Sequence, residues 1–280
     1  PAPIVSSDPS LLDLDLPLVE NALVRFIREE VVERRGFRSV VLGVSGGVDS
    51  AVSLFLACRA LGPENVYGFR LPYATSSEDS LEHARLALEA TGAHSRTIEI
   101  TGPVDGYLKA EEPDADGQRR GNVMARTRAV ILFDQSARLH ALPLGTGNKS
   151  ERLLGYYTWH ADDSPPINPL GDLFKTQVWA LARHLGVPDE IIDKPASADL
   201  VQGVHDEDEL GIGYAAADPI LYWLVRGYTK DDLVRSGFDP AEVAVVHRRL
   251  SSTHWKRELP TVAMLSSSAI GAFYLRPVDY

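Results

Sequence analysis

The run Ser39-Val-Val-Leu-Gly-Val44 is an unbroken apolar segment rich in β-branched residues, and it ends in the turn Ser45-Gly-Gly-Val-Asp-Ser50. Such a run is typical of a strand that is buried on both faces of a parallel sheet. A helix is predicted directly after the turn, over residues 50–61, with Gly62 at its end. Two adjacent glycines let the backbone curl tightly between these elements. The segment therefore predicts a strand–turn–helix unit of an α/β fold.

The same alternation of strand and helix recurs along the first half of the chain. A strand is predicted near residues 66–71, a helix from Ser77 to Thr91 that ends at Gly92, and a strand over residues 95–100. An amphipathic helix over residues 18–35 precedes these units, and residues 1–17 read as an extended arm. This rhythm predicts a doubly wound, mainly parallel sheet flanked by helices, that is, a Rossmann-like architecture.

The remaining segments fit a single domain that spans residues 1–280. Residues 102–121 are polar and without periodicity, which predicts a loop. A helix over 122–139, with Val123, Val130, Ile131 and Phe133 as its apolar positions, leads into a short strand over 141–144. Residues 155–172 predict a loop that covers a site, 173–185 a helix, and 200–280 a mainly helical part. Within that part the acidic run 205–209 predicts a solvated surface segment.

Charge and cysteine content exclude several classes of function. Asp and Glu outnumber Lys and Arg by 39 to 28, which argues against a non-specific grip on a nucleic-acid backbone. The one cysteine, Cys58, forms no intrachain disulfide and is predicted to be an inert core residue. No run of eighteen apolar residues predicts a membrane span. These features favour a protein of the reducing cytoplasm.

The turn between the first strand and its helix is also a candidate anion cradle. Backbone N–H groups and the positive end of the helix dipole converge there, and the hydroxyls of Ser45 and Ser50 add hydrogen-bond donors. Asp49 would repel a phosphate but is suited to hold a magnesium ion that binds one. The alternative is an ordinary tight turn with a serine at the helix start. The string is neither a Walker A loop, which needs a lysine, nor GxGxxG.

The turn resembles the pyrophosphate loop of the N-type ATP pyrophosphatases, enzymes that cleave ATP between the α and β phosphates. Further segments resemble one member of that superfamily, the ammonia-dependent NAD synthetases. These segments are Arg120-Gly-Asn-Val-Met-Ala-Arg-Thr-Arg128, Gly145-Thr-Gly-Asn-Lys-Ser-Glu151, Asn168-Pro-Leu-Gly-Asp-Leu-Phe-Lys-Thr-Gln177, Lys194-Pro-Ala-Ser-Ala-Asp-Leu200 and His254-Trp-Lys-Arg-Glu-Leu-Pro260. The likeness extends from about residue 18 to residue 275.

The resemblance implies that ATP adenylates the nicotinate carboxylate of deamido-NAD and that ammonia then displaces AMP. It implies that Asp49 and Glu151 hold Mg²⁺, and that Lys175 is catalytic because it neutralises phosphate charge during transfer. The implied ATP-binding residues are Gly43, Val44, Ser45, Gly46, Gly47, Val48, Asp49, Ser50, Thr146, Lys175 and Ser197.

On the substrate side the resemblance implies that Arg126, with Arg128 nearby, and Lys256 bind deamido-NAD beside Trp255. Trp159 and Pro166 are further candidate substrate-binding positions. They stand where the family commonly carries a lysine and an aspartate that touch the substrate, so the contacts of those two side chains do not transfer. Asp162 is implied as a second catalytic residue, one that orders or deprotonates the incoming ammonium. Each of the three basic residues has the alternative of being an ordinary surface residue.

Free ammonia is the expected nitrogen donor, because the chain has neither the length for a fused glutaminase domain nor a second candidate region for one. Delivery of ammonia by a separate glutaminase partner stays open. The resemblance also implies a homodimer, and the apolar face of residues 122–139 is compatible with one, although core packing explains it equally well. Two alternatives remain. One is an adenylating ligase that amidates a different carboxylate. The other is a nucleotide-binding sensor without catalysis, which the presence of both predicted magnesium carboxylates disfavours.

Overall fold

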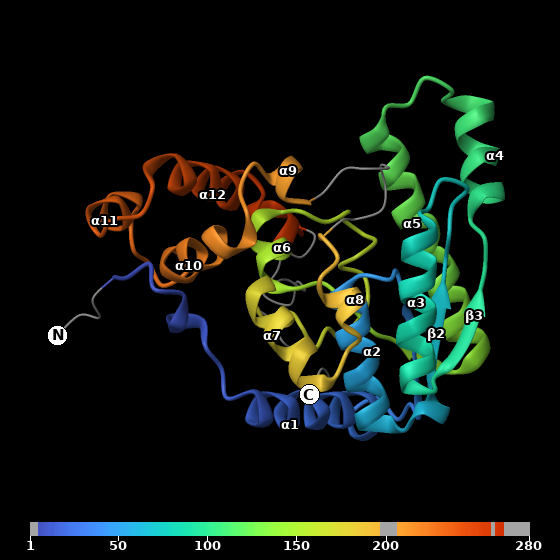
Figure 1. The fold of residues 1–280 in the computed structure, drawn as a ribbon. Coiled ribbons are helices and arrows are strands. Elements are labelled where there is room, and N and C mark those ends of the chain that lie inside the picture. Colours follow the sequence, from blue (N-terminus) through green and yellow to red (C-terminus); the bar gives the residue numbers. More distant parts are fainter. Residues whose placement is uncertain (1–4, 197–205, 259–260, 266–280) are drawn as a thin grey trace.

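The computed structural model describes residues 5–196, 206–258 and 261–265, and residues 39–143 contain a four-stranded parallel sheet. The strands are β1 (Ser39–Gly43), β2 (Val66–Arg70), β3 (His94–Thr97) and β4 (Ala141–Pro143), in the order β3-β2-β1-β4. Figure 1 shows strands β2 and β3 of this sheet on the side of the molecule opposite helices α10 (Tyr214–Leu224), α11 (Lys230–Arg235) and α12 (Pro240–Ser252). Val40 pairs with Val66 on one side and with Leu142 on the other. Because β1 is flanked on both sides, its carboxyl end opens into the middle of the molecule.

Alternate side chains of β1 enter two different cores. Val40 and Leu42 are fully buried against helices α1 (Leu16–Arg28), α2 (Val48–Leu61) and α7 (Lys175–Leu185), whereas Val41 is buried against α4 (Thr101–Glu111) and α5 (Gly117–Leu139). This is the side-chain period of two that a strand covered on both faces requires. The prediction of a doubly wound α/β fold is confirmed.

The predicted helix starts and ends mostly agree with the observed ones. The helix α3 (Glu78–Thr91) is capped by Ser77, whose Oγ accepts the Ser80 N–H at 3.1 Å, and it ends at Gly92 with φ 72°. The helix predicted over 18–35 is α1, which Asp15 caps, followed by a short π-helix, Glu29–Glu33. Cys58 is half-buried on α2, and burial raises the pKa of its thiol to about 11, so the thiol stays protonated.

The loop predicted over residues 102–121 is wrong for its first half, which forms α4. Val104 and Leu108, one helical turn apart, are buried in the same core as Met124. Two glycines and a proline hid this amphipathic pattern, and tertiary packing overrides their weak helix propensity. The next helix, α5, begins at Gly117 rather than Asn122, because the Asp116 carboxylate caps the Arg119 N–H at 2.8 Å.

The second half of the described chain adds a helical layer with its own core, formed by α6 (Lys149–Leu154) and α9 (Asp206–Leu210) together with α10, α11 and α12. Helix α8 (Asp189–Ile192) instead buries Ile191 and Ile192 in the core that α1, α2 and α7 share. Short 3-10 turns lie at Pro9–Leu12, Pro63–Asn65 and His254–Arg257. The N-terminal arm joins this layer, since the Trp223 indole N–H donates to the Ser6 carbonyl at 2.8 Å. The acidic run is not wholly solvated, because Asp206 is buried.

Helix α5 leaves part of its apolar face exposed. Val130 and Phe133 of α5 leave 69% and 42% of their surface exposed, so core packing does not account for the whole apolar face of this helix. Among the described residues, no helix combines the length and hydropathy that crossing a bilayer requires.

Candidate active site

The turn after β1 packs so closely on a neighbouring helix that one of its positions admits only glycine. Gly46 has φ 85°, and a Cβ there would lie 2.1 Å from the backbone carbonyl oxygen of Ser80 at the start of α3. Gly47, the N-cap of α2, has no such contact with α3. The sequence thus places the loop at the carboxyl end of β1 and fixes its path against α3.

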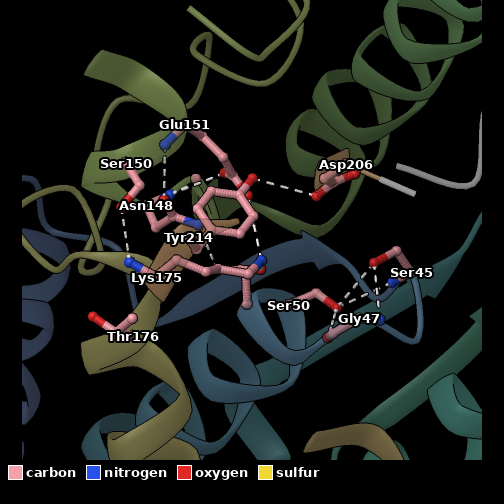
Figure 2. A network of polar contacts seen from close by, with 12 residues as sticks. Ser45, Gly47, Ser50, Asn148, Ser150, Glu151, Lys175, Thr176, Asp206 and Tyr214 are labelled. Atoms are coloured by element: carbon pink, nitrogen blue, oxygen red, sulfur yellow. Dashed lines mark hydrogen bonds and ion pairs between the residues drawn. The ribbon is translucent and has the colours of Figure 1, made fainter. Parts of the chain in front are cut away.

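The hydroxyl groups of this loop bind its own backbone (Figure 2). The Ser45 N–H donates to Ser50 Oγ at 3.2 Å, the Gly47 N–H donates to Ser45 Oγ at 3.3 Å, and the Ser50 hydroxyl donates to the Gly47 carbonyl at 2.9 Å. The loop is therefore preorganised, and its N–H donors are held by weak, exchangeable partners near the helix dipole of α2.

Three charged side chains meet beside this loop. Lys175 is 3% exposed, and its ammonium contacts the Asp49 carboxylate at hydrogen-bond distance and Glu151 Oε1 at 3.5 Å (Figure 2). They come from the starts of α7, α2 and α6, so three helices converge on one buried point. Sequence comparison predicted all three residues, and the structure brings them together.

Asn148 completes the cluster, and sequence reasoning gave it no role. Its side-chain amide donates to Asp49 Oδ1 at 2.8 Å, and its Oδ1 accepts the Glu151 N–H at 2.9 Å. Glu151 Oε2 in turn accepts the Asn148 N–H at 3.2 Å, which makes a reciprocal capping box. The signal was present as an asparagine followed three positions later by a glutamate.

The charges of the cluster do not balance. Burial, and next the charge of Asp49, raise the pKa of Glu151 to about 8, against the opposing effect of Lys175. Burial alone would lower the pKa of Lys175, but Asp49 and Glu151 outweigh burial and raise it, so the ammonium stays charged. When both carboxylates are ionised, two negative charges face one cation in a desolvated place, and below pH 8 a proton on Glu151 removes this excess.

This excess charge fits a magnesium ion. Asp49 and Glu151 supply hard carboxylate oxygens on one small region, and a divalent cation would relieve the repulsion that perturbs Glu151. Two protein carboxylates suit Mg²⁺, which usually completes its shell with water and phosphate oxygens. Among the described residues, no group of three or more acidic, histidine or cysteine side chains forms a closed cage.

A second group of predicted residues gathers around the loop that follows α6. The Arg126 guanidinium donates to the Trp159 carbonyl at 3.2 Å, and the Trp159 and Trp255 rings meet edge to face with centroids 5.2 Å apart. The Lys256 ammonium donates to the carbonyls of Gly155 and Tyr157, each at 2.8 Å. The predicted substrate residues Arg126, Trp159, Trp255 and Lys256 thus share one region.

Asp162 lies in the same loop, and its carboxylate accepts the Thr158 N–H at 2.7 Å. Surrounding protein raises the pKa of Asp162 and lowers that of Lys256, in both cases chiefly by desolvation. Because Asp162 keeps an exposed surface, water limits the change in its pKa. It remains an accessible acceptor beside two basic residues.

The other predicted residues vary in position. Arg128 is half-buried and donates to the Leu71 carbonyl at 3.0 Å, and Thr146 follows β4 in the loop before Asn148. Pro166 is exposed. Ser197 lies outside the residues that the structure describes.

Sequence reasoning missed two more residues near the loops. Lys194 donates to Ser80 Oγ at 2.7 Å, which places a cation beside the carbonyl that limits Gly46. The Tyr214 ring lies under Lys175, with its centroid 5.5 Å from the ammonium. Neither residue follows a periodic pattern that would have marked it.

Together the parallel sheet, the glycine-limited loop and the carboxylate–lysine cluster define an α/β protein built to bind a phosphorylated nucleotide at the carboxyl ends of its strands. The NAD synthase family model matches residues 19–260, and the chain belongs to this family. The NH3-dependent NAD+ synthetase of Chlorobaculum parvum is 48% identical over 265 residues, which cover 94% of this chain and 95% of that protein.

Solved structures agree. The NH3-dependent NAD synthetase from Campylobacter jejuni, solved with a nitrate ion, gives a TM-score of 0.76 at 31% identity and covers 89% of this chain and 100% of that one. The NMN synthetase from Francisella tularensis gives 0.77 at 27% identity, with 90% and 99% coverage.

Proposed function

We propose that this chain is a ligase that converts deamido-NAD to NAD with ATP and ammonia. The nicotinate carboxylate attacks the α phosphorus of ATP, pyrophosphate leaves, and an acyl adenylate forms. Ammonia then attacks the acyl carbon, AMP leaves, and the nitrogen loses a proton to become the amide. The observation that carries the proposal is the cluster of Asp49, Glu151 and Lys175 beside the glycine-rich loop.

On the ATP side, the loop from Gly43 to Ser50 receives the departing pyrophosphate. The N–H groups now held by Ser45 and Ser50 turn to phosphate oxygens, which are stronger acceptors than neutral hydroxyls. The Lys175 ammonium stabilises the negative charge that develops on the phosphates. Because Lys175 is buried, little water screens this interaction, and the stabilisation is large. Thr146, in the loop between β4 and Asn148, contacts the nucleotide.

We expect Mg²⁺ to bind on the ATP side of the site, next to the triphosphate. Asp49 and Glu151 hold the ion, and Asn148 and the capping box fix the direction of the two carboxylates. The bound ion supplies charge neutralisation of the triphosphate.

On the dinucleotide side, Arg126 and Lys256 supply two cations, and Trp159 with Trp255 supplies an aromatic wall. Asp162 is exposed in the same loop as Trp159, where it orders ammonium and accepts its proton. Replacement of Asp162 by Asn should therefore raise the KM for ammonium and spare the pyrophosphate exchange that reports adenylation.

The direct test is an incubation with ATP, Mg²⁺ and ammonium, with and without deamido-NAD, in which released pyrophosphate and NAD are measured. Both products should require deamido-NAD, and AMP should form in equal amount. Asp49→Asn should abolish turnover and leave some nucleotide binding. Pyrophosphate release that ignores deamido-NAD refutes the proposal, and so does an Asp49→Asn enzyme at full activity.

A second candidate substrate is a nicotinate mononucleotide, because the structurally similar Francisella protein is an NMN synthetase and because Trp159 and Pro166 depart from the residues common at these positions in the family. We favour the dinucleotide, since the relatives of 44–48% identity carry the NAD+ synthetase name. Comparison of kcat/KM for the two substrates decides between them.

We further propose that the whole chain acts as one catalytic domain in the cytoplasm and as a homodimer. The single domain is supported by Tyr214 of α10, which reaches Lys175, and the cytoplasm by the lone thiol Cys58. The dimer is supported by the exposed pair Val130 and Phe133, which lie three residues apart and hence on one side of α5.

A further inference from the structure

Helix α10 carries one charged residue, Asp218, within the apolar sequence Tyr-Ala-Ala-Ala-Asp-Pro-Ile-Leu-Tyr-Trp-Leu. Its side chain is completely buried. A buried carboxylate is costly unless hydrogen bonds compensate it, so its presence in this core requires an explanation. The reaction described above makes no use of it.

The hydrogen bonds of Asp218 all lead to the starts of two helices. Oδ1 accepts the Ser150 hydroxyl at 2.5 Å, and Oδ2 accepts both the Thr176 N–H at 2.9 Å and the Thr176 hydroxyl at 2.8 Å. The Ser150 oxygen in turn accepts the Lys175 N–H at 2.9 Å. The Ser150 hydroxyl therefore links the Asp218 carboxylate by hydrogen bonds to the backbone of Lys175, the first residue of α7.

Each of these contacts is adjacent in sequence to a residue of the active site. Ser150 precedes Glu151 on α6, and Thr176 follows Lys175 on α7. The Asp218 carboxylate thereby connects the start of α6, next to Glu151, with the start of α7, next to Lys175. The side chains of Glu151 and Lys175 meet with Oε1 and Nζ 3.5 Å apart. Figure 2 shows Ser150 and Lys175 joined in this network.

Hydrogen bonds oppose the cost of burying Asp218. Burial raises the pKa of the Asp218 carboxyl, whereas the hydrogen bonds from Ser150 and from the Thr176 N–H, which can only donate, act to lower it. The positive end of the α7 dipole adds a favourable field. Tyr214, four residues earlier on the same side of α10, places its ring near the Lys175 ammonium.

We infer that Asp218 is a positioning residue, which sets the separation of Glu151 and Lys175 from beneath the active site through Ser150 and Thr176. The inference rests on the proposed function, and it assigns the helical C-terminal layer a part in catalysis. Asp218 touches neither substrate nor reacting atoms, so its removal acts through the geometry of other side chains.

The test uses Asp218→Asn, Ser150→Ala and the double variant in the full chain. The amide keeps the shape but cannot accept hydrogen bonds on both sides, and losing such a charged acceptor costs about 10- to 100-fold. We expect kcat to fall by about that factor in either single variant, with smaller changes in the KM for deamido-NAD. The double variant should be little worse than Asp218→Asn, because both changes break the same hydrogen-bonded link.

Gln135→Leu is the matched control. Gln135 is also buried, and its Oε1 accepts a hydrogen bond from the Arg96 guanidinium at 3.0 Å. It lies near the C-terminus of α5, away from the carboxyl ends of the strands. This control should lower Tm and leave kcat unchanged. Affinity for magnesium-ATP, measured by calorimetry without turnover, should fall about 10-fold in Asp218→Asn and stay unchanged in the control.

Three results would overturn the inference. The first is an Asp218→Asn enzyme with normal kcat and normal nucleotide affinity. The second is a loss of kcat in the double variant that equals the combined losses of the two single variants. The third is a loss of kcat in Gln135→Leu that is as large as its fall in Tm would predict. The calorimetric measurement needs no deamido-NAD, so failure of the proposed reaction leaves the test of Asp218 intact.

Discussion

Replacement of Gly46 by Ala tests the contact that fixes the glycine-rich loop after β1, which we propose to bind phosphate. The new Cβ would lie 2.1 Å from the Ser80 carbonyl oxygen, whereas ordinary contact begins at 3.4 Å. The loop or the start of α3 therefore has to move by about 1.3 Å, the difference between these distances. Misplacing a reacting group by about 1 Å can reduce a rate about 100-fold.

Gly36→Ala provides the matched control, because Gly36 also has a left-handed backbone, with φ 70°, but no atom lies within 4 Å of its new Cβ. Both substitutions incur the left-handed penalty of about 1–2 kcal/mol. For a chain of this size that penalty lowers Tm by about 2–8 °C. Only Gly46→Ala adds displacement of the loop.

The assay is pyrophosphate release with deamido-NAD and ammonium saturating and ATP varied, alongside thermal unfolding of both variants. We expect Gly36→Ala to keep the kcat/KM for ATP and Gly46→Ala to lose about 100-fold, with the larger fall in Tm. If the two variants show the same kcat/KM, the close approach to Ser80 does not control the loop and the reasoning fails.

Three further predictions concern ion binding, a second cation and assembly. Because the pKa of Glu151 is raised to about 8, the proton there stabilises the metal-free fold at low pH, and this stability is lost as pH rises through 8. Magnesium affinity, measured as the rise in Tm that the ion produces, should grow by up to about tenfold per unit of pH and level off above 8, and a flat profile would contradict the assignment. Lys194→Ala should raise the KM for ATP several-fold with kcat nearly unchanged, since Lys194 lies at Ser80 beside the loop; an unchanged KM in the same assay excludes a phosphate contact. Val130→Glu should shift the protein from dimer to monomer in sedimentation velocity, whereas Leu18→Glu, at a residue 64% exposed on α1, should not, and a dimer in both places the interface elsewhere.

Local patterns carried the sequence prediction of the sheet and of the phosphate loop. The apolar run of β1, the glycines after it and the capping serine of α3 act over a few residues, so each is legible in the chain itself. The helix α4 was missed because Val104 and Leu108 gain their stability from a core contributed by distant segments. Long-range burial of this kind leaves only a weak mark on local sequence.

Sequence motifs identified some residues of the candidate site, whereas only long-range packing identified others. Asp49, Glu151 and Lys175 lie in motifs, and their resemblance to a family identified them without geometry. Asp218 and Tyr214 reach the site only because α10 packs under α7, a contact between residues far apart in sequence. An isolated aspartate in an apolar helix was the available signal, and it indicates burial without naming the partner.

The capping box at α6 makes one side chain, that of Glu151, responsible both for a helix start and for the proposed ion site. Glu151 gives one oxygen to the Asn148 N–H and turns the other toward Lys175. Gln at this position still offers an oxygen to the helix start but carries no charge for an ion, whereas Ala offers neither. The difference in stability between these two variants therefore measures the contribution of the capping box alone. Most substitutions that remove the proposed ion ligand also loosen the start of α6, the helix that precedes the loop containing Trp159.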